Sequence, residues 1–489
     1  MTTCLRRGPS RSAALIGALL LIGTATCAQP VDGADRLTAE QVATVVQSCY
    51  YTSGPLSGSL RRDRPVPIYA PDPHDPWNRL HHLLFSRTIR SEMAHYFRDG
   101  QPAELEARLA SAASEEERRN LLFDPRILFG PGALLTMERR IGGDAPDFFL
   151  HHEVAFLLQD GRRLSALEQL LAEADTETFL KGRSTIARVL LQQDLWNRFD
   201  ELDSLVRYGD NVTIRGSAER LKTLLGRAIT RLACRPEDLA RISSNLPAIA
   251  AAHTMVDPDL FATDSAWREI VPFKSSSAGT TFHAHTAGCR RLFRAFLRVP
   301  PQAGGAQCLE EFFRKYDELG TSSPGLPCFP SNHLAPGSRA MLVETLLALS
   351  PTGEIVPLPL IFSIELREIR PLVPGPDGRF TLDDIPFFVF HGSRLLFVRS
   401  GGRSGGLVEI PADAPVPAHV SAFQSGGRQL VPARLACPHC HDSAGQRLFR
   451  RLDEIRVLRP GNTLAQEAVL RAKQIRDDYR DLKRYFPVH

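Results

Sequence analysis

The chain lacks the short fingerprints that identify several large classes of enzyme. Its 489 residues contain no phosphate-binding P-loop, no Gly-x-Ser-x-Gly nucleophile turn and no glycine-rich dinucleotide fingerprint. The stretch His151-His152-Glu153 also lacks the His-Glu-x-x-His spacing of zinc metalloproteases. That spacing places both histidines on one face of a helix, whereas adjacent histidines point about 100° apart. We expect these histidines, like the pair His81-His82, to be ordinary surface or core residues.

A strong charge of either sign is also missing. The formal net charge is +4 over 489 residues, and the basic residues do not gather in one basic run. Arginine greatly outnumbers lysine throughout, which we interpret as a genome-wide bias rather than as a binding surface. Proteins that bind nucleic acid usually cluster basic residues on one face, so we expect no nucleic-acid partner.

Long apolar runs are absent after the first 28 residues, so we expect no transmembrane helix in the mature chain. Residues 1–28 begin with arginines, continue with the apolar run 13–22 and end in small residues at Ala28, which is the order of a secretory signal peptide. A second interpretation makes Cys27 a lipid-modified residue, although Thr24 stands where lipoproteins usually have leucine. The sequence therefore predicts export to the periplasm or cell envelope.

Cysteines are few, and an odd number of them remains after residue 28. Apart from the pair discussed below, the mature cysteines are Cys49, Cys234, Cys289, Cys308 and Cys328. Disulfides are permitted outside the cytoplasm, and Cys308 and Cys328 lie close together in the sequence. We expect a disulfide between these two residues.

The hydrophobic pattern changes character near residue 265. The stretch "STIARVLLQQDLWNRFDELDSL" places Leu191, Leu195, Phe199 and Leu202 at spacings of four, four and three, which predicts a helix. The later stretch "IFSIELREI" alternates, which predicts a half-buried strand with Leu360, Phe362, Ile364 and Leu366 on one side.

These patterns predict an α+β multidomain protein. We expect a mostly α-helical N-terminal half, a β-rich second domain built as a sandwich or small barrel, and a short helical C-terminal segment. The predicted divisions are a signal peptide at 1–28, an α-helical domain at 29–260, a β-rich domain at 265–425 and a C-terminal segment at 426–489.

The C-terminal segment is expected to end in an amphipathic helix that docks on the protein's own core. Its apolar seam has spacings of three and four and consists of Leu464, Ala468, Ala472, Ile475, Tyr479 and Leu482. A coiled coil that binds a partner is the alternative.

The same segment holds the motif Cys437-Pro438-His439-Cys440-His441. Two thiols at this spacing can bond the two vinyl groups of a haem, and the histidine that follows can bind the iron. These five residues resemble the attachment segment of c-type cytochromes, and the chain resembles large exported bacterial proteins that carry such a segment near the C-terminus. The resemblance implies a haem c held by Cys437 and Cys440, with His441 as the proximal iron ligand.

The chain departs from a usual cytochrome in the residues after the motif. All five methionines precede it, and the only histidine after His441 is His489. Other candidates for a second iron ligand lie earlier in the chain: His283, His285, His391 and His419. An iron with five ligands is a further alternative, and a full cytochrome fold is not expected.

Three other interpretations of the motif stay open. Cys-Pro-His-Cys resembles the active site of thioredoxin-like disulfide oxidants, although the 49 residues after Cys440 leave no room for that fold. Cys437, Cys440 and His441 could also supply zinc ligands, but no second Cys-x-x-Cys exists. The fourth interpretation is a plain disulfide or two idle cysteines.

The sequence therefore predicts an exported c-type haem-binding protein that transfers electrons outside the cytoplasm. Its partner would be a redox protein or a cell-envelope surface. The alternative is a haem-free exported scaffold or binding protein in which Cys437 and Cys440 form a structural disulfide. No residue pattern names a substrate, so the sequence leaves open whether the chain is an enzyme.

Overall fold

The fold is described from a computed structural model of the chain. The described residues are 65, 67–93, 111, 113–114, 135–141, 154–174, 177–208, 212–272, 291–319, 326–328, 334–369, 387–401, 405–410, 415–417, 430–432, 455–457, 470, 473–474 and 476–487. The predicted signal peptide and Cys27 lie outside them, so export stays a prediction. Among the described residues, no helix is long and apolar enough to cross a membrane.

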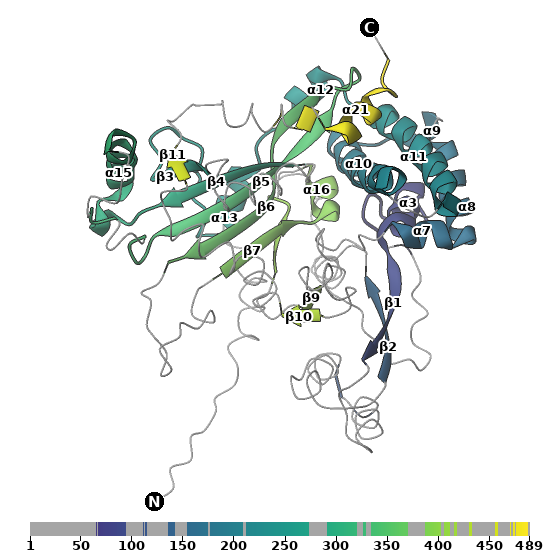
Figure 1. Ribbon diagram of the computed structural model, residues 1–489, viewed down its shortest axis with the longest axis horizontal. Helices are drawn as coiled ribbons and strands as arrows, with labels where there is room; N and C mark the ends of the chain where they lie inside the picture. The colour runs from purple at the N-terminus through teal and green to yellow at the C-terminus, as the bar shows by residue number, and fades with distance from the viewer. Residues whose placement is uncertain are drawn as a thin grey trace, which may run out of the picture.

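The predicted α+β class is confirmed, since helices and an antiparallel sheet make up the described chain (Figure 1). The helices that precede the sheet are α3 (Pro76–Phe85), α7 (Ala155–Gln159), α8 (Gly161–Glu173), α9 (Glu177–Leu180), α10 (Thr185–Tyr208), α11 (Val212–Leu232), α12 (Pro236–Ala240) and α13 (Leu246–Ala252). A two-stranded ribbon of β1 (Arg87–Met93) and β2 (Leu135–Ile141) interrupts the region that the sequence predicted to be mostly helical.

Helix α10 lies at the centre of the helical part and confirms the predicted stripe. Leu191, Leu195, Phe199 and Leu202 are completely buried in the largest hydrophobic cluster. The helix is also buried on other faces, through Gln192, Gln193, Asp194 and Arg198. A helix enclosed on several sides is a core helix rather than a surface one.

The main sheet has seven strands in the order β11-β3-β4-β5-β6-β7-β8, and each neighbouring pair is antiparallel. The strands are β3 (Trp267–Pro272), β4 (Arg291–Arg298), β5 (Arg339–Leu349), β6 (Ile355–Glu368), β7 (Phe387–Gly392), β8 (Leu407–Ile410) and β11 (Ile455–Val457). A further ribbon pairs β9 (Pro415–Pro417) with β10 (Leu430–Pro432).

Among the described residues, helices pack on both faces of the main sheet. Leu246 and Ile249 of α13 pack in one cluster with Phe296 of β4 and Met341 of β5. Neighbouring residues of β4 and β5 point to the opposite face, where they meet Leu309 and Phe312 of α15 (Gly305–Leu319). The predicted sandwich or small barrel therefore differs from the described strands, which form an open sheet that needs helices to bury its apolar faces.

One irregularity in β6 overturns the predicted alternation of that strand. Ser363 pairs with Glu344 and Ile361 pairs with Thr345, so Phe362 is an extra residue in β6. Such a bulge moves the following side chains to the other face. Ile364 packs in the cluster beneath α13, whereas Phe362 packs in the helical core, so the expectation that they share a side was wrong.

Side-chain amides connect α10 to the end of β5. The Gln192 side chain donates to the carbonyl of Leu349 at 3.3 Å and accepts from its N–H at 2.8 Å. Gln193 donates to the carbonyl of Leu347 at 2.7 Å. Buried amides are stabilising only when they are hydrogen-bonded, so these contacts specify how the helix meets the sheet.

The predicted continuous C-terminal helix is interrupted before Asp477, and four residues of its predicted seam lie outside the described residues: Leu464, Ala468, Ala472 and Ile475. Helix α21 spans Asp477–Lys483, and Arg476 before it has an extended backbone with φ −68° and ψ 146°. This extended residue interrupts the predicted continuous seam, and its side chain donates to the Asp478 carboxylate at 2.9 Å. Tyr479 and Leu482 do pack on the protein's own core, as predicted, and the Tyr479 hydroxyl donates to the carbonyl of Gly353 at 2.5 Å.

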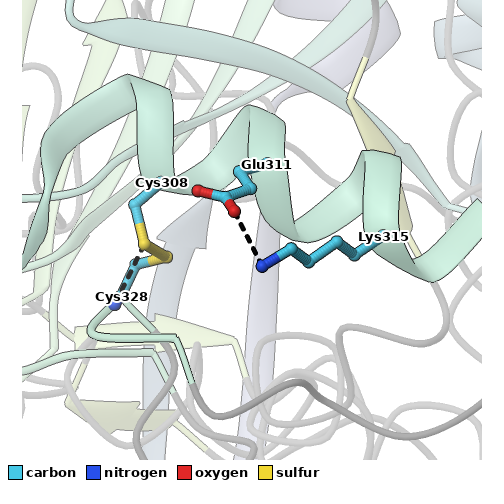
Figure 2. The surroundings of a disulfide bond; sticks show 4 residues. All are labelled: Cys308, Glu311, Lys315 and Cys328. Carbon is cyan, nitrogen blue, oxygen red and sulfur yellow. Dashed lines mark hydrogen bonds and ion pairs between the residues drawn. A yellow bond between two sulfur atoms is a disulfide. The ribbon is translucent and has the colours of Figure 1, made fainter.

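The predicted disulfide between Cys308 and Cys328 is confirmed. Figure 2 shows the bond between Cys308, on α15, and Cys328, with their Cα atoms 5.9 Å apart. Both residues belong to the cluster beneath α15. On the same helix Glu311 and Lys315 form an ion pair at 2.7 Å, and Lys315 lowers the pKa of the Glu311 carboxyl.

Replacing both Cys308 and Cys328 with alanine should lower the free energy of unfolding by about 3 kcal/mol, because the bond closes a loop of 20 residues in the unfolded chain. Denaturant unfolding with and without reductant measures this effect. Wild type and a Cys234→Ala control should lose stability in reductant, and the double variant should not. A wild-type protein that is insensitive to reductant would contradict the assignment.

Candidate functional site

The residues predicted to hold a haem lie outside the described part of the chain. These are Cys437, Cys440 and His441. The same is true of Cys289 and of most candidates for a second ligand, His283, His285, His419 and His489, as well as of His151, His152 and Glu153. Among the candidates for a second ligand, His391 is the one that the structure describes.

His391 is a buried residue of β7, in register with Ser363 of β6. Its ring meets the ring of Phe362 edge-on, with centroids 5.1 Å apart, and its Nδ1 lies 3.3 Å from the carbonyl oxygen of Gly392. Burial, together with the charges of Arg291 and Arg394, holds the pKa of His391 well below its usual value. The imidazole is therefore neutral, and no group of three or more metal-ligating residues occurs in the described ranges.

A buried, bidentate ion pair joins the helical part to α16 (Arg394–Ser400). Asp194, on α10, accepts two hydrogen bonds from Arg394, from Nε to Oδ2 at 2.8 Å and from Nη2 to Oδ1 at 2.7 Å. Both side chains are almost completely inaccessible to solvent. A bidentate arginine–carboxylate pair in such surroundings is among the strongest side-chain contacts.

Two residues near the start of the described chain complete the surroundings of Asp194. The Tyr69 hydroxyl donates to Asp194 Oδ2. His81, on α3, has its Nε2 3.6 Å from the same oxygen, and its side chain is completely buried. Desolvation lowers the pKa of His81 to about 3, so the imidazole is neutral at ordinary pH. We call the contact formed by Tyr69, His81, Asp194 and Arg394 the Asp194 cluster.

A second buried ion pair lies on the sheet beside the Asp194 cluster. Arg291 of β4 binds Glu344 of β5 at 2.6 Å, and its guanidinium lies 4.1 Å from the centroid of the Phe362 ring. The guanidinium of Arg394 lies 5.7 Å from that centroid. Burial raises the pKa of Glu344 and lowers that of Arg291, while the attraction between the two opposes both shifts.

These contacts fit a structural role better than a catalytic one. The Asp194 carboxylate accepts bonds from Tyr69 and Arg394, so its oxygens are engaged with the protein's own donors. A general base needs hydrogen-bond reach to a substrate, and none of these groups is exposed. The arrangement instead connects α3, α10, α16 and the sheet through charges that desolvation would otherwise disfavour.

Sequence reasoning missed the Asp194 cluster. Asp194 and Arg394 are 200 positions apart, and neither belongs to a known short motif. The available signal was a carboxylate beside the apolar stripe of the helix, next to two glutamines. Such a residue is expected to be paired when it is buried, but nothing local identifies its partner.

Comparisons with protein-family models, with curated proteins and with solved structures found no match for the chain.

Replacing Asp194 with asparagine should destabilise the protein by about 3–5 kcal/mol, because it leaves the buried Arg394 guanidinium without an opposite charge. Denaturant unfolding measures the change. The matched control is Asp238→Asn, which removes a carboxylate from an exposed pair with Arg235 and should leave the unfolding midpoint unchanged. Equal effects in the two variants would rule out a special contribution from the buried pair.

Proposed function

We propose that the chain is an exported protein that carries one covalently attached c-type haem and transfers electrons outside the cytoplasm. The single observation that carries this proposal is the motif Cys437-Pro438-His439-Cys440-His441. Two thiols and one imidazole at this spacing are the donor set that haem c requires.

Each residue of the motif has a distinct proposed role. Cys437 and Cys440 tether the porphyrin through thioether bonds, and His441 binds the iron on the proximal side. A bound haem would supply a one-electron couple, whose potential depends on the second ligand and on burial. Whether a reaction is catalysed at the iron depends on an open ligand position, and the chain names no substrate.

The disulfide supports the proposed compartment. Structural disulfides form and persist outside the cytoplasm, where covalent haem attachment also takes place. The Cys308–Cys328 bond therefore agrees with the signal-peptide pattern of residues 1–28. The two observations are independent, because one is the order of residue types in the first 28 residues and the other is a bond in the packing beneath α15.

The remainder of the chain is proposed to be a scaffold for the C-terminal segment 426–489. In this proposal the helical region 29–260 and the strand-rich region 265–425 act together, since α10 and the end of β5 pack in one hydrophobic cluster. They would present the haem to a redox protein or to a cell-envelope surface.

The alternative is an exported scaffold without haem, in which Cys437 and Cys440 are joined as a disulfide that constrains the tail. The same cysteine spacing and the same oxidising compartment support it. Reductant releases no thiol from Cys437 and Cys440 when thioether bonds hold them, whereas it releases two when they form a disulfide. Alkylation before and after reduction therefore separates the two proposals.

Expression in a host with haem-attachment machinery tests the proposal directly. The acid-denatured wild-type chain should keep haem peroxidase colour on a gel, and its mass should exceed that of the mature polypeptide by one haem. Replacing Cys437 and Cys440 with alanine should abolish both signals, because the porphyrin loses its tethers. A His441→Ala variant should shift the Soret band through loss of the proximal ligand.

The control variant is Cys234→Ala, which removes a buried free thiol and should keep full haem content. A wild-type mass equal to that of the polypeptide, with no Soret absorption, rejects haem attachment. If Cys437 and Cys440 then become alkylated only after reduction, the haem-free alternative holds.

A further inference from the structure

His81 is the one histidine in the described chain whose ring is completely buried with neither nitrogen hydrogen-bonded. Its side chain has no exposed surface, and neither Nδ1 nor Nε2 has a hydrogen-bond partner. The ring instead packs between aromatic rings, 4.9 Å from the centroid of Phe85 and 6.1 Å from that of Tyr69. A buried polar group without partners is destabilising, so its presence calls for an explanation.

The nearest acceptor is already occupied. Asp194 Oδ2 lies 3.6 Å from His81 Nε2, beyond hydrogen-bond distance, and accepts from the Tyr69 hydroxyl and from Arg394 Nε at 2.8 Å. A protonated imidazole has two donors and would have to compete for this oxygen. The closed cluster therefore accommodates the neutral ring and rejects the charged one.

The elements around His81 are held by contacts that do not involve the imidazole. The indole Nε1 of Trp77, on α3, donates to the carbonyl of Phe179 at 3.0 Å. Arg163, on α8, donates to the carbonyls of His82 and Leu83 at 2.9 and 2.7 Å. Neither contact contains a group that titrates between pH 4 and 6.5, so within α3 the pH response of this interface is expected to depend on its histidines.

We propose that the packing of α3 against α10 is a proton-linked interface, which opens as the pH falls because His81 takes up a proton when it becomes exposed. The proposal concerns the described fold and does not depend on haem attachment. It assigns a role to the unpartnered ring: the ring allows α3 to sit at the Asp194 cluster at neutral pH and releases it in acid.

The sign of the effect follows from the two protonation equilibria. Desolvation is the largest cause that lowers the pKa of His81 from 6.5 to about 3 in the closed state. Asp194 raises it, whereas Arg394, His82 and Arg198 lower it further. An exposed imidazole returns to about 6.5, so opening takes up a proton between pH 6.5 and 3. The contribution of His81 to the stability of the closed interface is therefore complete above pH 6.5 and is lost as the pH falls towards 3.

Hydrogen exchange of the amides of α3, measured on the full chain, tests the proposal. The rates are first corrected for the pH dependence of chemical exchange. The opening constant of α3 in wild type should then rise on the order of 50- to 100-fold between pH 6 and pH 4. This rise is counted beyond any change that variants without the imidazole also show. The same measurement on α11 should show a smaller rise, because α11 does not contact His81.

Two variants remove the titratable group in different ways. His81→Phe preserves an aromatic ring between Tyr69 and Phe85, and His81→Gln preserves polarity without a titration near neutral pH. Both should lose the extra rise at α3, and agreement between them separates loss of titration from altered packing. His253→Asn is the matched control, because burial also lowers the pKa of His253 but this ring packs on Phe390, away from α3. The variant should keep the wild-type pH dependence of the opening constant of α3.

The proposal is overturned if the variants that fold keep the wild-type rise at α3, or if α3 and α11 open together with the same pH dependence. If neither variant folds, an NMR titration of wild-type His81 decides the question. A ring that stays neutral in the closed state at pH 5 supports the proposal, and a ring that is protonated at pH 5 with α3 still packed overturns it.

Discussion

Asp194 is a carboxylate that the fold places in the most enclosed part of α10, where an isolated negative charge would be strongly disfavoured. Arg394 neutralises it through two hydrogen bonds, and Arg394 in turn comes from the helix that follows β7. The pair therefore couples the position of α10 to the end of β7. Removing one partner would leave a buried charge, so neither region can repack without the other.

Neutral side chains repeat this connection at two further places. Gln192 and Gln193 of α10 bind the backbone at the end of β5, and Asn245 binds both the N–H and the carbonyl of Ile361 at 2.8 Å. Hydrogen bonds to a strand backbone depend on register, whereas apolar contacts tolerate sliding. The polar residues thus decide which of several apolar packings the helices adopt on the sheet.

Local pattern predicted the elements better than it predicted their environment. The spacing of Leu191 and Leu195 predicted α10, because helical periodicity is a local property of the sequence. The burial of Asp194, in contrast, depends on Arg394, which is 200 residues away. Ile364 lies on the other face from Phe362 because a bulge adds one residue to the strand, which alternation alone cannot reveal. The expected seam is interrupted at Arg476, where the backbone is extended. Of the proposed haem site, Cys437, Cys440 and His441 lie outside the described residues, so the motif alone carries that prediction.

The segment around α21 has a consequence for the order in which the molecule matures. Tyr479, Leu482 and Phe486 belong to the same hydrophobic cluster as Ile68 and Trp77, although more than 390 positions separate the two sets. A nascent chain that has emerged only as far as β8 still exposes the apolar surface those three side chains cover. Stable closure of this cluster must therefore await synthesis of nearly the whole polypeptide.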